Sequence, residues 1–174
     1  SQVFGGDGAF CFIDQTNGNQ AIASYVFNSF YYSSNGGASF GTTLIEDQTT
    51  GSFINPADYD DNQNILYSCK DVNSIYRISG IGTSPITSTV TISGMFSKAT
   101  HIKVSPYTTV STKLFIGTGG GNLYKVTSAN IGVSPTVVNI AGASFPNATI
   151  SSVEFGASED EIIVTFFNYG VNSV

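Results

Sequence analysis

Four copies of one pattern, a β-strand, a short polar loop and a second β-strand, run along this chain of 174 residues. The copies are AIASYVFNSFYYSS, ILYSCKDVNSIYRIS, LFIGTGGGNLYKVT and IIVTFFNYGVNSV. Their corresponding first-strand positions Ile22, Tyr67, Ile116 and Val164 lie 45, 49 and 48 residues apart. Another strand and a polar turn precede each copy. Self-similarity at this spacing predicts a repeat protein in which each repeat is a small antiparallel sheet.

The copies are rich in β-branched and aromatic residues and lack helical periodicity, which predicts an all-β chain. Repeats of about 40 to 50 residues that each form a four-stranded sheet are typical of β-propellers. We therefore expect one domain, a β-propeller segment of about three and a half antiparallel blades. The expected repeat units are 1–47, 48–95, 96–143 and 144–174. Since propellers usually have roughly four blades or more, further blades of the same polypeptide are expected to complete the ring.

Composition argues against several kinds of partner. Twelve acidic and six basic residues give a net charge of -6, and Arg77 is the only arginine, so nucleic acid is not an expected partner. The longest apolar run, near 162–167, is far shorter than the roughly 20 residues of a membrane span, so membrane insertion is not expected. Cys11 and Cys69 fit neither a metal-binding pair nor a dense disulfide framework. We expect both to be free, buried thiols.

The stretch SSNGGASF, which follows FYY, has the composition of a tight turn between two strands. An Asn side chain can hydrogen-bond to its own turn backbone, and Gly supplies positive φ angles. The stretch resembles the Asp box, Ser/Thr-x-Asp-x-Gly-x-Thr-Trp, with Asn for Asp, Ser for Thr and Phe for Trp. The matching residues are Ser33, Asn35, Gly37, Ser39 and Phe40. We expect them to form a structural turn rather than a ligand-binding loop.

With its surroundings, GGDGAFCFIDQTNGNQAIASYVFNSFYYSSNGGASF, this turn resembles the repeats of BNR (Asp box) β-propellers. That family includes sialidase-like, sortilin-like and photosystem-assembly-factor-like proteins. The resemblance implies that the turn joins the outer strands of a blade, remote from the central channel. It also implies an extracytoplasmic location, secreted or at the cell surface, because large exported bacterial proteins similar to this one contain such propellers.

Loops beside the inner strands are the candidate binding sites, because the inner strands of a propeller line its channel. Asp7 lies in GGDG ahead of the first strand, and Asp71 lies in a loop between two strands. Phe167 and Tyr169, in FFNYGVN, could stack on a sugar or could equally pack between blades. The expected function is a non-catalytic scaffold that recognises glycans or proteins.

Asp71 also supports an alternative function. Its segment LYSCKDVNSIYR resembles the LYARTDVGGAYRW type of segment in xyloglucanase-like endoglucanases, which implies that Asp71 is a catalytic carboxylate, acting as a general base. Glycoside hydrolysis normally requires two carboxylates, no second one can be assigned here, and the chain contains no tryptophan for sugar stacking. A third class, an assembly chaperone like the photosystem factor, is the least favoured because the arginine patch of that family is absent.

Three further features have simpler structural interpretations. GTGGGN at 117–122 continues into a strand rather than a helix, which predicts a hairpin loop and not a phosphate site. DYDDNQN at 58–64 predicts an exposed turn between strands, with a calcium site as the alternative. His101 has no second histidine to form a metal or nucleophile set and is expected to be structural. We expect no metal site and no cofactor.

Overall fold

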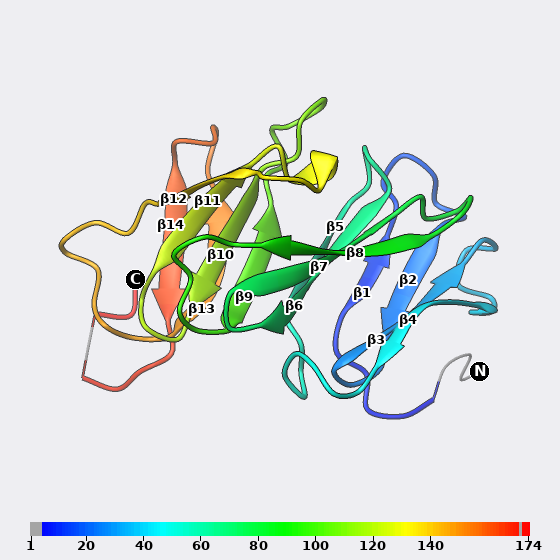
Figure 1. Ribbon diagram of the computed structural model, residues 1–174, viewed down its shortest axis with the longest axis horizontal. Coiled ribbons are helices and arrows are strands. Elements are labelled where there is room, and N and C mark those ends of the chain that lie inside the picture. The colour runs from blue at the N-terminus through cyan, green and yellow to red at the C-terminus, as the bar shows by residue number, and fades with distance from the viewer. Residues whose placement is uncertain (1–4, 171) are drawn as a thin grey trace.

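The computed structural model describes residues 5–170 and 172–174, and the regular structure in them is almost entirely β (Figure 1). The strands form three four-stranded sheets and one two-stranded sheet, and strands adjacent in sequence pair in each. Sheet 1 contains β1 (Cys11–Ile13), β2 (Ala21–Ser24), β3 (Asn28–Ser33) and β4 (Thr42–Asp47). Sheet 2 contains β5 (Ala57–Asp60), β6 (Ile65–Asp71), β7 (Ser74–Ser79) and β8 (Ile86–Thr91). Sheet 3 contains β9 (Ala99–Val104), β10 (Leu114–Thr118), β11 (Leu123–Thr127) and β12 (Thr136–Asn139). Sheet 4 contains β13 (Ile150–Phe155) and β14 (Ile162–Phe166).

The strand pairs are antiparallel, and one short 3-10 helix, η1 (Ala129–Ile131), lies ahead of β12. The all-β class and the repeated antiparallel sheets predicted from the sequence are therefore confirmed. The corresponding positions Ile22, Tyr67, Ile116 and Val164 lie in β2, β6, β10 and β14, which are the second strands of the four sheets. After β14 the chain turns back, and the Phe166 amide donates a hydrogen bond of 2.9 Å to the Ser173 carbonyl. The fourth copy was expected to end in a second strand, but Val174, its last residue, lies outside any strand.

The sheets pack face to face, and a separate apolar cluster fills each of the three interfaces between them. Sheets 1 and 2 enclose a cluster built from side chains such as Ile22, Phe30, Leu66 and Ile78. Sheets 2 and 3 enclose a second, which includes Tyr67, Ile75, Ile102 and Ile116. Sheets 3 and 4 enclose a third, which includes Phe115, Leu123, Ile150 and Val153. Each inner sheet is therefore buried on both faces by its neighbours.

Alternation along the central strands explains how one sheet contributes to two clusters. Successive side chains of a strand point to opposite faces, so in β10 Leu114 and Ile116 join the cluster shared with sheet 2 while Phe115 joins the cluster shared with sheet 4. In β6 Tyr67 faces sheet 3 and Leu66 faces sheet 1. Strands buried on both faces are expected to be continuously apolar, as LFI in β10 is.

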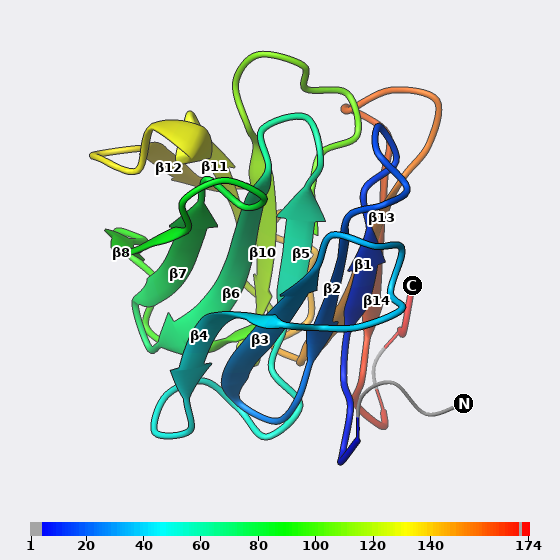
Figure 2. The same cartoon turned by 90° about the vertical axis from the view of Figure 1, so that its right-hand side faces the viewer.

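The first strands of the sheets gather on one side of the molecule and the fourth strands on the other (Figure 2). β9 contacts both β5 and β13, the first strands of the neighbouring sheets. Of the fourth strands, β8 and β12 are mostly exposed, and β4 is exposed over half of its residues. In the described residues no helix is long and apolar enough to cross a membrane.

Two expectations about individual residues are wrong. Cys69 is buried and free as expected, but Cys11 is exposed because β1 is the edge strand of sheet 1. The stretch 58–64 is not wholly an exposed turn, because its first three residues belong to β5, and Asp60 is only 3 % exposed.

Candidate functional site

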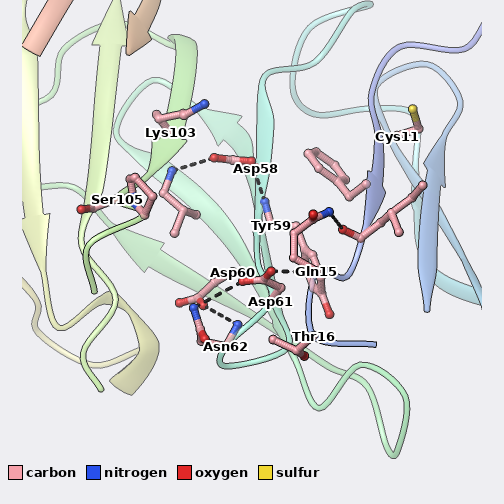
Figure 3. A pocket seen from close by; sticks show the side chains of 14 residues that line it. Cys11, Gln15, Thr16, Asp58, Tyr59, Asp60, Asp61, Asn62, Lys103 and Ser105 are labelled. Carbon is pink, nitrogen blue, oxygen red and sulfur yellow. Dashed lines mark hydrogen bonds between the residues drawn. The ribbon is translucent and has the colours of Figure 1, made fainter. Parts of the chain in front are cut away.

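A polar hollow lies where the first strands of sheets 1, 2 and 3 approach one another (Figure 3). We call it the inner hollow. Its volume is about 650 Å³, and it opens toward the loops that follow β1, β5 and β9. Its walls combine aromatic rings, carboxylates, amides and one ammonium group; the side chains used below are Phe12, Gln15, Asp58, Tyr59, Asp61, Asn62 and Lys103.

Asp58 sits in the wall of the inner hollow and links sheet 2 to sheet 3. Its Oδ2 accepts a hydrogen bond of 2.7 Å from the Val104 amide of β9, and its Oδ1 accepts one of 2.9 Å from the Tyr59 amide. Burial raises the pKa of Asp58 to about 6, although these two hydrogen bonds and the nearby Lys103 ammonium oppose the increase. Asp58 is therefore a carboxyl group that titrates close to neutral pH.

Lys103 continues the polar row from sheet 3 to sheet 4. Its Nζ lies 3.0 Å from Glu154 Oε2 on β13. Asp58, Lys103 and Glu154 thus come from three neighbouring first strands, β5, β9 and β13. The ion pair of Lys103 is made with Glu154.

Two buried aspartates at the ends of the first strands, Asp14 directly after β1 and Asp60 as the last residue of β5, hold the loops at the mouth of the inner hollow. Asp14 Oδ1 accepts hydrogen bonds from the Thr16 and Asn17 amides at 2.7 and 2.8 Å. Asp60, at the corresponding position of sheet 2, accepts amide hydrogen bonds of 3.1 Å in the same pattern. Burial by itself would raise the pKa of Asp14, but the hydrogen bonds from Thr16, Asn17 and Tyr59 lower it below its ordinary value.

Each of these aspartates also accepts a hydrogen bond from a hydroxyl group of the next sheet. The Tyr59 hydroxyl of sheet 2 lies 3.2 Å from Asp14 Oδ2 of sheet 1, and Thr112 Oγ1 of sheet 3 donates to Asp60 Oδ2 of sheet 2. We call these two contacts the carboxylate–hydroxyl pins. Sequence reasoning missed them, although an Asp after the first strand in both FCFID and ADYD was a usable signal.

One side of the inner hollow is aromatic and its rim is polar. The rings of Phe12 and Tyr59 lie 6.3 Å apart, centroid to centroid, with 44° between their planes. At the rim, the Gln15 amide of the sheet 1 loop donates a 3.1 Å hydrogen bond to Asp61 Oδ2 of the sheet 2 loop. Asn62 beside it is exposed. Figure 3 shows Gln15, Tyr59, Asp61 and Asn62 around the opening.

The binding residues expected from the sequence lie elsewhere. Asp7 is exposed ahead of β1, and Asp71 is exposed at the end of β6, where its carboxylate accepts a 2.8 Å hydrogen bond from the Val72 amide. Phe167 and Tyr169 are exposed after β14 and border a smaller hollow of about 330 Å³. In the loop 166–172 they belong to, residue 171 lies outside the described residues. None of the four lines the inner hollow. Asp7 precedes β1, Asp71 ends β6, and Phe167 and Tyr169 follow β14, so they lie at the opposite end of the strands.

The residues matched to the Asp box lie in the connection between β3 and β4. Asn35 Oδ1 accepts hydrogen bonds from Ser33 Oγ and the Ser39 amide at 2.8 and 3.0 Å, and Ser33 Oγ accepts one of 3.0 Å from the Gly37 amide. Gly37 has φ 82°, a left-handed conformation that glycine adopts without strain. Phe40 follows at the end of the connection. These side chains hydrogen-bond to their own turn.

The remaining candidates are placed in regular structure. Residues 117–122 connect β10 to β11 as a hairpin. His101 lies in β9, and burial together with the Lys103 ammonium lowers its pKa. Across residues 5–170 and 172–174, no group of three His, Cys, Asp or Glu side chains is placed to hold a metal ion.

Comparison with known proteins adds no family. No family model matches this chain, and no curated protein has significant similarity to it. The function must therefore be inferred from the geometry of the sheets and of the inner hollow.

Proposed function

We propose that this chain is a segment of a BNR-type β-propeller and that it serves as a non-catalytic scaffold recognising glycans or proteins. The proposal places it in a bacterial protein that is secreted or held at the cell surface. The observation that carries it is the arrangement of the sheets, in which consecutive antiparallel meanders pack face to face and the first strand of sheet 3 contacts the first strands of sheets 2 and 4.

This arrangement supports a radial rather than a linear stack. In a propeller the first strands surround the axis and the fourth strands lie at the periphery, so first strands are close and fourth strands are far apart and exposed. The contacts of β9 with β5 and β13, and the exposure of β8 and β12, agree with that geometry. In the proposal, further sheets of the same polypeptide complete sheet 4 and the ring.

The chemistry of the carboxylates supports binding rather than catalysis. A glycosidase acid or nucleophile must reach the substrate, and two such groups must face each other across the bond that breaks. Here the carboxylates of Asp14, Asp58 and Asp60 accept hydrogen bonds from backbone amides. Asp14 and Asp60 also accept hydrogen bonds from hydroxyl groups of neighbouring sheets. The Asp71 carboxylate accepts a hydrogen bond from the Val72 amide of its own turn.

The direct test is to incubate the protein with a soluble β-glucan and to measure both binding and the release of reducing sugar. We expect binding without release of sugar, and no change in binding in Asp71→Ala. Release of sugar that disappears in Asp71→Ala would contradict the scaffold and establish the hydrolase alternative.

A further inference from the structure

The inner hollow has the properties of a ligand site that the expected binding residues do not include. We propose that it binds a neutral, hydroxyl-rich carbohydrate, a few sugar units long, between the first strands of sheets 1, 2 and 3. This inference rests on the proposed recognition function and gives it a location and a ligand class. Its volume of about 650 Å³ lies within the roughly 300–1,000 Å³ of small-ligand sites.

The first argument is the pairing of an aromatic wall with a polar rim. The C–H face of a sugar ring is apolar and packs against aromatic side chains, while its hydroxyl groups need donors and acceptors. Phe12 and Tyr59 supply the rings, and they are held together at 6.3 Å. The amides of Gln15 and Asn62, both exposed at the rim, supply donors and acceptors.

The second argument is electrostatic. Asp58, Asp60 and Asp61 line the hollow and would repel a phosphate, sulfate or uronate group. The one ammonium group, Lys103, is already paired with Glu154 at 3.0 Å, so it does not offset that repulsion.

A cationic ligand is disfavoured for a different reason. Backbone amides and the Thr112 hydroxyl already donate two or more hydrogen bonds to each of Asp58 and Asp60, so these carboxylates have few free oxygen lone pairs at which a cation could bind. A neutral ligand that offers hydroxyl groups to the remaining lone pairs fits these walls best.

The third argument is rigidity. The hydrogen bond from the Gln15 backbone amide to the Asp61 carboxylate joins the rim loops of sheets 1 and 2. The carboxylate–hydroxyl pins hold the loops beneath them. Walls that are ordered before binding lose less conformational entropy when a ligand binds.

Cys11 provides the experiment, because it is an exposed thiol in the wall of the hollow. The other cysteine is buried, and burial raises the pKa of the Cys69 thiol to about 11, so a maleimide applied to the folded protein reacts at Cys11. Protein with and without biotin-maleimide at Cys11 is applied to immobilised β-glucan, xylan and galactan oligosaccharides, together with oligogalacturonides and chitosan oligosaccharides. Cys11→Ser protein treated with the same reagent is the control.

We expect untreated protein and the treated Cys11→Ser control to bind a neutral oligosaccharide, and alkylated protein to lose that binding. Asn62→Ala should weaken binding about fivefold, as expected for one lost hydrogen bond, whereas Asn19→Ala, exposed and outside the hollow, should leave it unchanged. Neutral-sugar binding that survives alkylation and Asn62→Ala would overturn this site while leaving the recognition function intact. Binding of charged oligosaccharides alone would overturn the ligand class, and binding of no oligosaccharide would overturn the inference and the glycan half of the proposed function together.

Discussion

Asp58 shows how one side chain serves both the packing of two sheets and the wall of the inner hollow. Its carboxylate accepts a hydrogen bond from the Val104 amide of sheet 3, which favours the charged form, but burial outweighs this and raises the pKa to about 6. A carboxyl group with a pKa above its unfolded value stabilises the folded state when protonated. That contribution is complete below the unfolded pKa of about 3.8 and is lost as pH rises through about 6.

We therefore predict that Asp58→Asn removes this pH dependence. Relative to the variant, the wild-type free energy of unfolding should fall by about 2 kcal/mol between pH 4 and pH 8, because the neutral amide has no charge to bury. Urea unfolding at a series of pH values measures the difference. Asp71→Asn, at an exposed carboxylate, is the matched control. A constant gap between wild type and Asp58→Asn across this range would contradict the buried, proton-binding role.

Individual residues also mark where sequence reasoning reached its limit. The turn residues from Ser33 to Phe40 were predictable because their hydrogen bonds are local. The exposure of Cys11 and the burial of Asp60 were not, because both depend on which strand lies at the edge and on what the next sheet contributes. A pattern within one segment carries no information about a hydroxyl group that is more than 40 residues away.

The strands and their connections are linked across each interface by polar as well as apolar contacts. The carboxylate–hydroxyl pins join sheet 1 to sheet 2 and sheet 2 to sheet 3. At the third interface, Ser105 Oγ donates a 2.9 Å hydrogen bond to Glu159 Oε2, and Lys113 and Lys125 Nζ lie 3.0 and 2.7 Å from Glu159 Oε1. Hydrogen bonds to a buried or half-buried carboxylate fix the register of one sheet against the next, which apolar packing alone defines less sharply.

Thr112→Val tests the second pin with almost no change in shape. Asp60 is 3 % exposed, so removal of the donor leaves a buried carboxylate oxygen without its inter-sheet hydrogen bond. We expect the free energy of unfolding to fall by about 1–3 kcal/mol, measured by urea denaturation. Thr43→Val, at an exposed position of β4, should change it by less than about 0.5 kcal/mol. Equal effects of the two substitutions would show that the pin does not contribute to stability.

The number and order of sheets in the whole molecule followed from the spacing of the repeat, since each copy placed a second and a third strand. The inner hollow did not follow, because it is formed by three first strands that are distant in sequence and are ordinary strands individually. The candidate residues Asp7, Asp71, Phe167 and Tyr169 were selected from single loops, and the loops bordering the hollow are at the other end of the strands.

The central claim about the whole molecule is that its sheets are arranged radially, with the first strands near a common axis and the fourth strands far from it. Pulsed electron paramagnetic resonance between pairs of spin labels measures this directly in the protein with Cys11 and Cys69 replaced. One pair is placed in the first strands of sheets 1 and 3, at Ile13 and Lys103, and the other in their fourth strands, at Thr43 and Val138. A radial arrangement predicts a clearly shorter distance for the first-strand pair than for the fourth-strand pair. Equal distances for the two pairs would indicate a linear stack of sheets and would contradict the propeller.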